Sequence, residues 1–304
     1  MKKIILLGII FTNLQAIAQT ELDGIFLNKK LLCVGAVYSR MQWQQYWEGN
    51  FKRENLNLGK VSANSIAVNA NYGLTNSINL LANAQYVATK ASAGQLAGLQ
   101  GLQDLAMHTK WSFYKTTIKA GTLNCIAIAG FSLPLSNYTP DLMPLSIGLK
   151  SKTATARVMV DYQKNKWFAT LSGSYAYRGN VTLDRNTYYT STLRYTNKVE
   201  MPNVTTLNIR AGYRSSSWVI EAFANQMNSL SGFDITKNNM PFVSNKMNAT
   251  TTGLHFKYIP ASLNGLEVVA DGITTIYGRN VGQNTGISVG IFYLMNVAKK
   301  KKTK

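Results

Sequence analysis

Apolar and polar residues alternate along most of this chain, and the stretch from Asn69 to Trp111 contains one complete repeat of the pattern. Apolar side chains occupy every second position from 78 to 86, with mostly polar ones between them: Ile78, Leu80, Ala82, Ala84 and Tyr86 on one side, and Asn79, Asn83 and Gln85 on the other. A period of two residues is typical of a β-strand with one apolar and one polar face. The short turn 72–77 precedes this strand. A longer loop at 91–101 follows it and leads to a second alternating strand, Leu105 to Tyr114.

The same alternation predicts about twelve strands along the chain. Their ranges are 30–40, 61–72, 78–89, 105–114, 118–133, 153–162, 167–178, 203–214, 218–227, 248–259, 266–277 and 285–297. Short turns, such as 115–117 and the Asn264-Gly265 turn, alternate with longer loops, one of which is predicted to carry a hairpin around Tyr188 to Tyr195. This arrangement predicts a single all-β domain, an antiparallel up-and-down transmembrane barrel with roughly 10 to 14 strands.

The main alternative fold is a secreted β-sandwich, whose strands would also alternate. A sandwich gives no reason for the loops to segregate by length, or for aromatic residues to recur near strand ends. In a membrane barrel, aromatic residues form girdles at the two membrane interfaces. The candidates for these girdles are Tyr72, Tyr86, Trp111, Tyr162, Trp167, Tyr213, Trp218 and Tyr258.

Residues 1–18 have the three regions of a secretory signal peptide. Met1-Lys2-Lys3 is the charged region, Ile4 to Phe11 is the apolar region, and Ala16-Ile17-Ala18 is the cleavage site. The apolar run is shorter than the roughly 20 residues that a spanning helix needs, which disfavours a membrane anchor. We therefore expect export through the inner membrane, an outer-membrane barrel over residues 19–298 and a solvated basic tail over residues 299–304.

The net charge and the cysteines narrow the function classes further. The formal net charge is +19, to which Lys2 and Lys3 contribute. Such a charge also occurs in nucleic-acid-binding proteins, but the signal peptide and the spread of basic residues through strands and loops argue against nucleic acid as a partner. The two cysteines, Cys33 and Cys125, fall on predicted strands and are expected to be small apolar residues without a function.

Motifs of catalysis or metal binding are not recognisable in the sequence. His108 and His255 lie in alternating strands, without the serine two positions later that outer-membrane lipid A deacylases carry. An embedded hydrolase needs a nucleophile and an oriented base, and no spacing of Cys and His suggests zinc. We expect that the protein is not an enzyme, that it uses no cofactor or metal, and that its histidines line a polar lumen.

The polar faces of the predicted strands place charged residues inside the barrel. The lumen-lining candidates are Lys110, His108, Arg157, Arg178, Arg210, Lys257 and Glu221, with Asp161, Glu267 and Asp271 as further inward acids and Tyr114 on the same face. Positively charged side chains that line a pore favour the passage of anions over cations. A weak anion preference is therefore expected.

Part of the chain resembles a known family. The similar segments are Tyr72-Gly73-Leu74-Thr75, Gly101-Leu102-Gln103-Asp104-Leu105 leading to Lys110-Trp111, and Phe131-Ser132-Leu133-Pro134. They resemble the outer-membrane transporters known as meta-pathway phenol degradation proteins, which are related in architecture to the fatty-acid and toluene transporters. The resemblance covers residues 67–178. It implies passive uptake of small molecules that are often hydrophobic or aromatic.

The sequence thus favours an outer-membrane channel or transporter for small hydrophobic, aromatic or anionic molecules, with outer-membrane lipid and the solute as partners. The alternative is a structural or secretion-associated barrel, of the kind found in type IX secretion and gliding, that binds protein partners at its turns or loops. Such barrels are similar in size and charge but usually begin with an Asn-Pro-Ala segment, which this sequence lacks.

Overall fold

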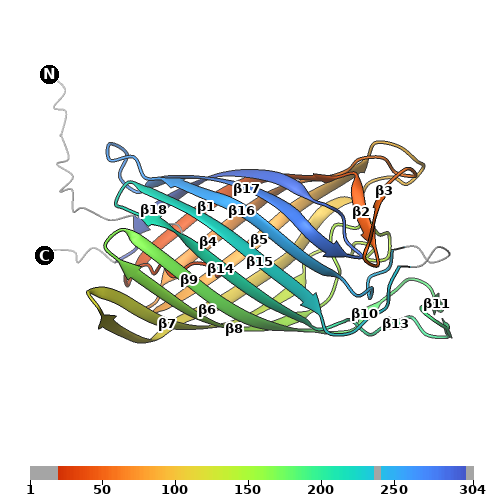
Figure 1. Ribbon diagram of the computed structural model, residues 1–304, viewed down its shortest axis with the longest axis horizontal. Helices are drawn as coiled ribbons and strands as arrows, with labels where there is room; N and C mark the ends of the chain where they lie inside the picture. Colours follow the sequence, from red (N-terminus) through yellow and green to blue (C-terminus); the bar gives the residue numbers. More distant parts are fainter. Residues whose placement is uncertain (1–19, 236–240, 299–304) are drawn as a thin grey trace, which may run out of the picture.

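In the computed structural model, the described residues are 20–235 and 241–298, and they form a closed barrel of twelve antiparallel strands. The barrel strands are β1 (Leu31–Trp43), β4 (Val61–Gly73), β5 (Ile78–Ala91), β6 (Gln100–Ile118), β7 (Gly121–Pro134), β8 (Thr153–Lys164), β9 (Trp167–Arg178), β14 (Val204–Arg214), β15 (Trp218–Ser229), β16 (Asn248–Tyr258), β17 (Leu266–Arg279) and β18 (Thr285–Asn296). Each strand pairs with its neighbours in this order, and β18 closes the barrel on β1 (Figure 1). The predicted up-and-down barrel is confirmed.

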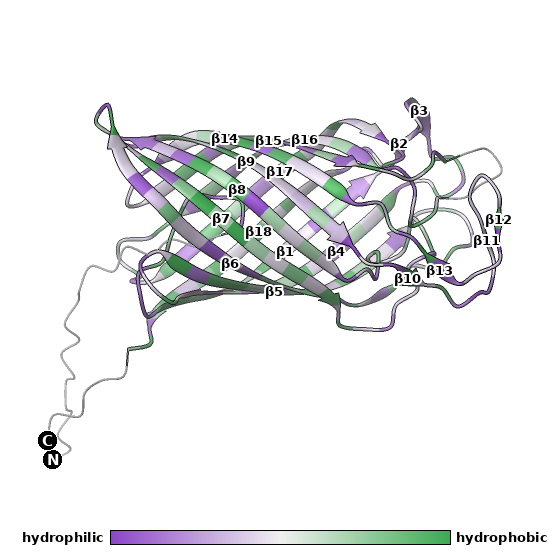
Figure 2. Ribbon diagram, turned by 90° about the horizontal axis from the view of Figure 1, so that it is seen from below, coloured by the Kyte–Doolittle hydropathy of each residue, from purple (hydrophilic) through white to green (hydrophobic). Residues whose placement is uncertain are grey.

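The alternation along each strand separates an outer wall from the lumen. Val158 is 66% exposed, whereas its neighbours Arg157 and Met159 are 9% and 2% exposed. Figure 2 shows apolar segments along the barrel wall, and the outward apolar residues include Ile66, Val68, Leu171, Leu207, Ile209, Ile287 and Val289. A closed barrel leaves no strand edge unpaired, and an apolar outer wall then suits a membrane. The arrangement excludes the alternative β-sandwich.

The β6–β7 hairpin differs from the prediction. Its turn consists of Lys119 and Ala120, both with positive φ (48° and 61°), rather than residues 115–117. Two-residue hairpin turns usually carry Asn or Gly, so these two residues provided no sequence signal. A β-bulge in β6 also inverts the alternation, since an extra residue shifts which side chains face inward. Tyr114 therefore lies opposite Cys125 and is 54% exposed, instead of lining the lumen.

The long loops gather at one end of the barrel, called here the long-loop end, and fold against one another. Their short strands are β2 (Gln45–Glu48) with β3 (Phe51–Glu54), β10 (Val181–Thr182) with β13 (Lys198–Val199), and β11 (Tyr188–Tyr189) with β12 (Leu193–Arg194). The last pair confirms the predicted hairpin. A shared apolar core contains Val181, Leu183, Tyr188, Val199, Met201, Phe242 and Val243.

The short turns lie at the opposite end, called here the short-turn end. The first and last barrel strands, β1 and β18, pair so that Leu31 lies opposite Asn296, which brings the two ends of the barrel sequence together there (Figure 1). The predicted signal peptide and basic tail lie outside the described residues. Within residues 20–235 and 241–298, no helix is long and apolar enough to cross a membrane.

Candidate functional site in the barrel lumen

The short-turn end of the lumen is filled by residues 20–30, called here the plug segment. Asp23, Ile25 and Leu27 of this segment are buried. Leu27 belongs to an apolar cluster with Leu31, Cys33, Val269, Phe292 and Leu294, and Phe26 packs against Ile126, Ile128 and Met159. The alternation along the sequence did not predict this plug. The available signal was the placement of Ile25 and Leu27 at alternate positions immediately before β1.

Lys110 anchors the plug segment. Its fully buried Nζ donates to Oδ1 of Asp23 (3.0 Å) and to the carbonyl oxygens of Thr20 (3.1 Å) and Ile25 (2.9 Å), and it lies 5.0 Å from the centroid of the Phe26 ring. Burial alone would raise the pKa of Asp23, but the Lys110 ammonium, with a further lysine charge and backbone N–H groups, holds that pKa well below its usual range. The carboxylate therefore stays charged and keeps the segment attached to β6.

Most of the other charged candidates form ion pairs inside the barrel. The pairs are Arg210 with Glu221, Arg214 with Asp161 (Nη1 to Oδ1, 3.0 Å) and Lys257 with Glu267 (Nζ to Oε2, 3.7 Å). His255 is in hydrogen-bond contact with Asp271 (Nδ1 to Oδ1, 2.6 Å). Arg157 instead donates from Nη1 to Oγ of Ser172 (2.9 Å). The expected anion preference was based on an excess of inward cations over inward acids. The pairing reduces its expected size, because each acid offsets the charge beside it.

The two remaining candidates lie apart from these pairs. Arg178 is the last residue of β9, next to the long loops, and its backbone N–H donates to Oδ1 of Asn203 (2.9 Å). His108 lies over Gly130 of β7, where a Cβ would come 2.1 Å from His108 Cδ2. The candidate residues are therefore distributed along the lumen instead of forming one ring.

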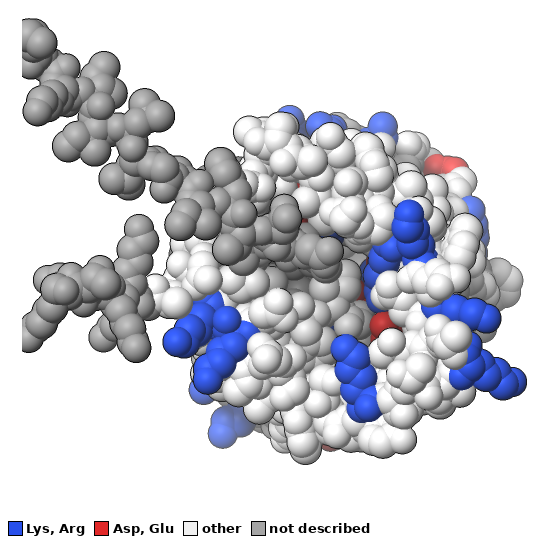
Figure 3. Space-filling model, turned by 90° about the vertical axis from the view of Figure 1, so that its left-hand side faces the viewer, with Lys and Arg blue, Asp and Glu red and all other residues white. Residues whose placement is uncertain are grey.

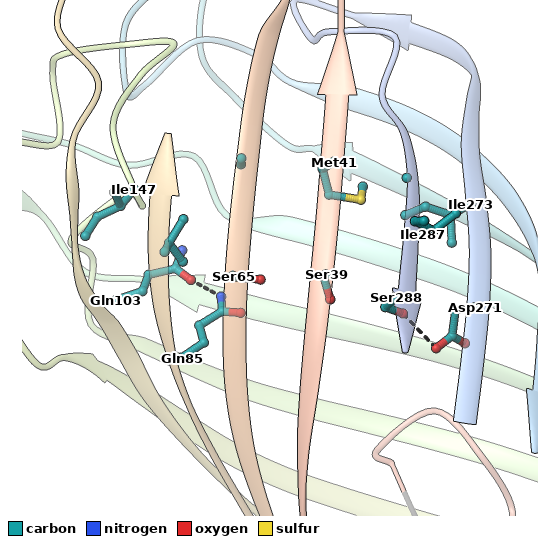
Figure 4. A pocket seen from close by; sticks show the side chains of 13 residues that line it. Ser39, Met41, Ser65, Gln85, Gln103, Ile147, Asp271, Ile273, Ile287 and Ser288 are labelled. Atoms are coloured by element: carbon teal, nitrogen blue, oxygen red, sulfur yellow. Dashed lines mark hydrogen bonds between the residues drawn. The ribbon is translucent and has the colours of Figure 1, made fainter. Parts of the chain in front are cut away.

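Between the plug segment and the long loops, the lumen contains a chamber of about 330 Å³ (Figure 4). Cross-strand pairing places four of its lining residues in one polar row: Ser65, Ser39, Ser288 and Asp271. The next row toward the long loops is mostly apolar: Ala63, Met41, Gly286 and Ile273. The chamber thus has a polar wall on the plug side and an apolar wall on the long-loop side.

Asp271 lies between this chamber and a second cavity of about 250 Å³ beside the plug segment, and it lines both. Its Oδ1 meets Nδ1 of His255 (2.6 Å), and its Oδ2 accepts from Oγ of Ser288 (2.9 Å). Since the hydroxyl donates to the carboxylate and not to the imidazole, the trio does not have the arrangement of an activated serine. Among the described residues, no group of three His, Cys, Asp or Glu could hold a metal ion.

The loop 135–152 closes the chamber from the other side. Leu145 and Ile147 of this loop are buried, and Ile147 lines the chamber. Tyr138 donates from its hydroxyl to Oδ1 of Asp104 (2.9 Å) and accepts from the backbone N–H of Lys150 (2.7 Å). Burial, with the adjacent carboxylate, raises the pKa of Tyr138 well above its usual range, so it remains a donor. From the sequence, this segment was expected only as one of the longer loops, between the predicted strands 118–133 and 153–162.

Three long loops meet at Asn280 and Asp234. Asp234 accepts from Nε of Arg279 (2.8 Å) and from Nδ2 of Asn280 (2.6 Å), while Oδ1 of Asn280 accepts from the backbone N–H groups of Gly49 (2.8 Å) and Ile235 (3.1 Å). These bonds connect the loop after β1, the loop after β15 and the loop after β17. The cluster of Asp234, Arg279 and Asn280 is called here the loop clasp.

The loop clasp is expected to loosen in acid. Hydrogen bonding to Arg279 holds the pKa of Asp234 below its usual range, so its contribution is present above about pH 4 and is lost as the pH falls from there through the lowered pKa. We expect the backbone amides of Gly49 and Ile235 to exchange hydrogen a few times faster in Asp234→Asn than in the wild type at pH 7, with the difference vanishing in acid. Hydrogen exchange followed by mass spectrometry measures this.

A matched control is Asp141→Asn, which removes the ion pair with Arg185 (Nε to Oδ2, 3.0 Å) elsewhere among the long loops. It should leave the exchange of Gly49 and Ile235 unchanged. Equal exchange in Asp234→Asn and the wild type at pH 7 would show that the loops hold together without the clasp.

The short-turn mouth contains a polar cavity of about 640 Å³, lined in part by Lys115, Lys166 and Arg214. Figure 3 looks onto this end and shows Lys and Arg side chains around the rim. Ile25 of the plug segment lines both this cavity and the cavity beside Asp271. There is no room for a side chain at Gly24, because a Cβ there would come 2.2 Å from the carboxyl carbon of Asp161. The plug segment is thus the barrier between the lumen and the short-turn side.

The barrel is similar to solved structures of outer-membrane proteins. An outer membrane channel from Pseudomonas putida F1 matches with a TM-score of 0.69 and 10% sequence identity, over 92% of this chain and 100% of that chain. Lower scores are found for the translocator domain of the autotransporter NalP from Neisseria meningitidis (TM-score 0.47, 12% identity, 88% of this chain and 90% of that chain) and for the KdgM porin in complex with disordered oligogalacturonate (0.44, 8%, 85% and 98%).

No model of a protein family matches the sequence, and a comparison with curated proteins also finds no match. The structural similarity to the Pseudomonas channel, at 10% identity, establishes the fold class, a twelve-stranded barrel of the outer-membrane type. The resemblance to the meta-pathway phenol degradation family stays a prediction.

Proposed function

We propose that this protein is an outer-membrane channel through which small molecules pass by diffusion, without energy coupling. The observation that carries the proposal is the series of cavities inside the closed barrel. A chamber of about 330 Å³ and a cavity of about 250 Å³ share Asp271, and the latter shares Ile25 with the cavity at the short-turn mouth. A solid structural barrel would not need lumen cavities of this size, which approach those of small-molecule sites.

The orientation and location follow the general rule for such barrels. Short turns face the periplasm and longer loops face the outside, so the plug segment narrows the lumen on the periplasmic side and the loop 135–152 narrows it on the outer side. The similarity to an outer membrane channel over the full length of that chain supports placement in the outer membrane. The protein itself is proposed to act without catalysis.

The solutes are proposed to be small and at least partly apolar. The apolar row of the chamber, with Met41 and Ile273, offers contacts for a hydrophobic or aromatic group. The polar row offers hydroxyl donors on Ser39 and Ser65 and the accepting carboxylate of Asp271. This agrees with what the resemblance to the meta-pathway family implies. The lumen-lining role of Lys110, Arg157, Arg210 and the other candidates is part of the same proposal.

Planar-bilayer recording tests the proposal. The wild type should show a small conductance with a weak preference for anions, and Arg157→Glu combined with Arg210→Glu should shift the preference toward cations, because it replaces two lumen cations by acids. Arg194→Glu combined with Lys198→Glu, at exposed positions of β12 and β13 outside the lumen, makes the same charge change and should leave the ratio unchanged. Absence of any conductance, or equal permeability for cations and anions in all three proteins, would argue against an open basic lumen.

A structural or secretion-associated barrel is the second candidate. One observation favours it: the β2–β3 hairpin and the β11–β12 region expose large apolar side chains beyond the barrel, with Phe51 at 77% and Tyr195 at 82% exposure. Exposed apolar groups at loop tips are typical of surfaces that contact another protein. Under this alternative the lumen would not conduct, so the same bilayer recording separates the two functions.

A further inference from the structure

A cavity of about 720 Å³ lies among the long loops, outside the chamber, and is called here the outer vestibule. Its wall comes from the end of β1, from the β2–β3 hairpin and the residues after it, and from the loop 92–99, with Pro144, Ile235 and Pro241 added by two other long loops. The volume lies within the roughly 300 to 1,000 Å³ that small-molecule sites occupy. None of the lumen candidates lines it, so it is a separate site within the described residues.

One side of the outer vestibule is aromatic. The ring centroids of Trp43 and Tyr46 lie 6.1 Å apart, and the two ring planes make an angle of 58°. Trp43 is fixed in place because it packs against the buried cluster of Leu58, Val61 and Leu145. An aromatic face carries partial negative charge, and the C–H groups on one face of a sugar ring carry partial positive charge. A fixed Trp ring is therefore a suitable platform for a sugar.

The other side carries groups that both donate and accept hydrogen bonds. The amides of Asn55, Asn57 and Gln95 line the vestibule, and an amide matches the donor and acceptor character of a sugar hydroxyl. Oδ1 of Asn55 accepts from the backbone N–H of Leu58 (3.2 Å), while its Nδ2 is buried and has no hydrogen-bond partner among the described residues. A buried donor without a partner is costly, so a turn of the Asn55 side chain that brings this donor to a ligand hydroxyl would add stability.

The charges of the vestibule cancel. Nε of Arg53 lies 2.8 Å from Oε2 of Glu48, and the two side chains form an ion pair at the rim. An anionic or cationic ligand would therefore meet a neutral pair instead of one free charge. A wholly apolar ligand would cover the amides of Asn55 and Gln95 without bonding to them, at a cost.

We propose that the outer vestibule binds a neutral carbohydrate, a saccharide of two or three units or a glycoside. Its sugar ring stacks on Trp43, and its hydroxyls bond to the Asn55 and Gln95 amides. This proposal depends on the proposed channel function in one respect: the bound sugar, or the molecule that carries it, would be a solute that enters the channel at its outer mouth. Binding itself does not require transport.

Saturation-transfer NMR and calorimetry with maltotriose and cellobiose test this, on full-length protein in an amine-oxide detergent, since detergents with sugar head groups would compete. At least one saccharide should bind, and n-octyl glucoside should displace it. Trp43→Ala and Asn55→Leu should each weaken binding about tenfold, equivalent to about 1.4 kcal/mol. Trp167→Ala removes an exposed outer-wall tryptophan at the start of β9 and should leave affinity unchanged.

Each variant is first checked for a folded barrel by its heat-modifiable migration on gels. Trp43 packs in the loop core, so Asn55→Leu keeps the test decisive if Trp43→Ala misfolds. No transfer to either saccharide, binding that both vestibule variants retain, or binding of phenol in place of the saccharides would overturn the proposal. A channel that conducts without binding sugars contradicts this inference alone, and a protein that binds sugars without conducting contradicts the proposed function alone.

Discussion

Ala82→Arg is expected to destabilise the folded barrel by about 2 to 4 kcal/mol, the cost of arginine on the lipid side near the membrane midplane. Ala82 lies near the middle of β5, on the same face as the exposed Leu80 and Tyr86, and pairs with Ala70 and Met107 on the neighbouring strands. The yield of heat-modifiable barrel after refolding into lipid vesicles, and its unfolding in urea, measure the effect.

The adjacent residue provides the matched control. Asn83 points into the lumen, where its Nδ2 donates to Oδ1 of Asn69 (2.7 Å). Asn83→Arg introduces the same side chain at a position that water and polar groups can solvate, so folding should change by less than about 1 kcal/mol. Greater damage from Asn83→Arg than from Ala82→Arg would mean that the outward face of β5 meets protein, not lipid.

Lys110→Met is expected to release the plug segment and to raise the single-channel conductance several-fold. The substitution leaves the Asp23 carboxylate buried without the ammonium that lies 3.0 Å from it. Removing one partner of a buried pair costs about 3 to 5 kcal/mol, because the remaining charge stays uncompensated. Leaving the lumen restores the hydration of that carboxylate, so the segment should come out. Planar-bilayer conductance and the protease sensitivity of residues 20–30 report its release.

Two further variants separate the plug from general effects. Lys119→Met removes an equal charge from the exposed β6–β7 turn and should leave the conductance unchanged. Lys110→Met combined with Asp23→Leu removes both charges, and since an apolar pair can replace a buried ion pair at little cost, closure should be largely restored. Wild-type conductance and protease resistance in a folded Lys110→Met would show that the apolar contacts of Phe26 and Leu27 hold the segment by themselves.

The interior of the lumen was only partly predictable. The sequence places Arg157, Arg210 and Lys257 on the polar phase of alternating strands, and in the structure all three side chains are buried. It could not predict the ion pair of Arg214 with Asp161, because these residues are 53 positions apart along the chain and meet only where β8 and β14 both pair with β9. Arg214 was missed as a functional residue because it lies at a strand end, where the alternation stops. The plug segment was missed because it is too short for the pattern to register.

By itself the sequence determined the barrel: which segments are strands, which side of each strand is apolar, and which end has the short turns. These properties are local, because a two-residue period and a turn depend on neighbouring residues only. Only the tertiary structure decided that the lumen is filled at one end by residues 20–30, that its cations are paired, and that loops after β1, β15 and β17 join at Asn280. The plug and loop contacts join residues far apart in the chain, and the Arg210–Glu221 and Lys257–Glu267 pairs join neighbouring strands. All of them therefore form only when the strands have paired and folded into the barrel.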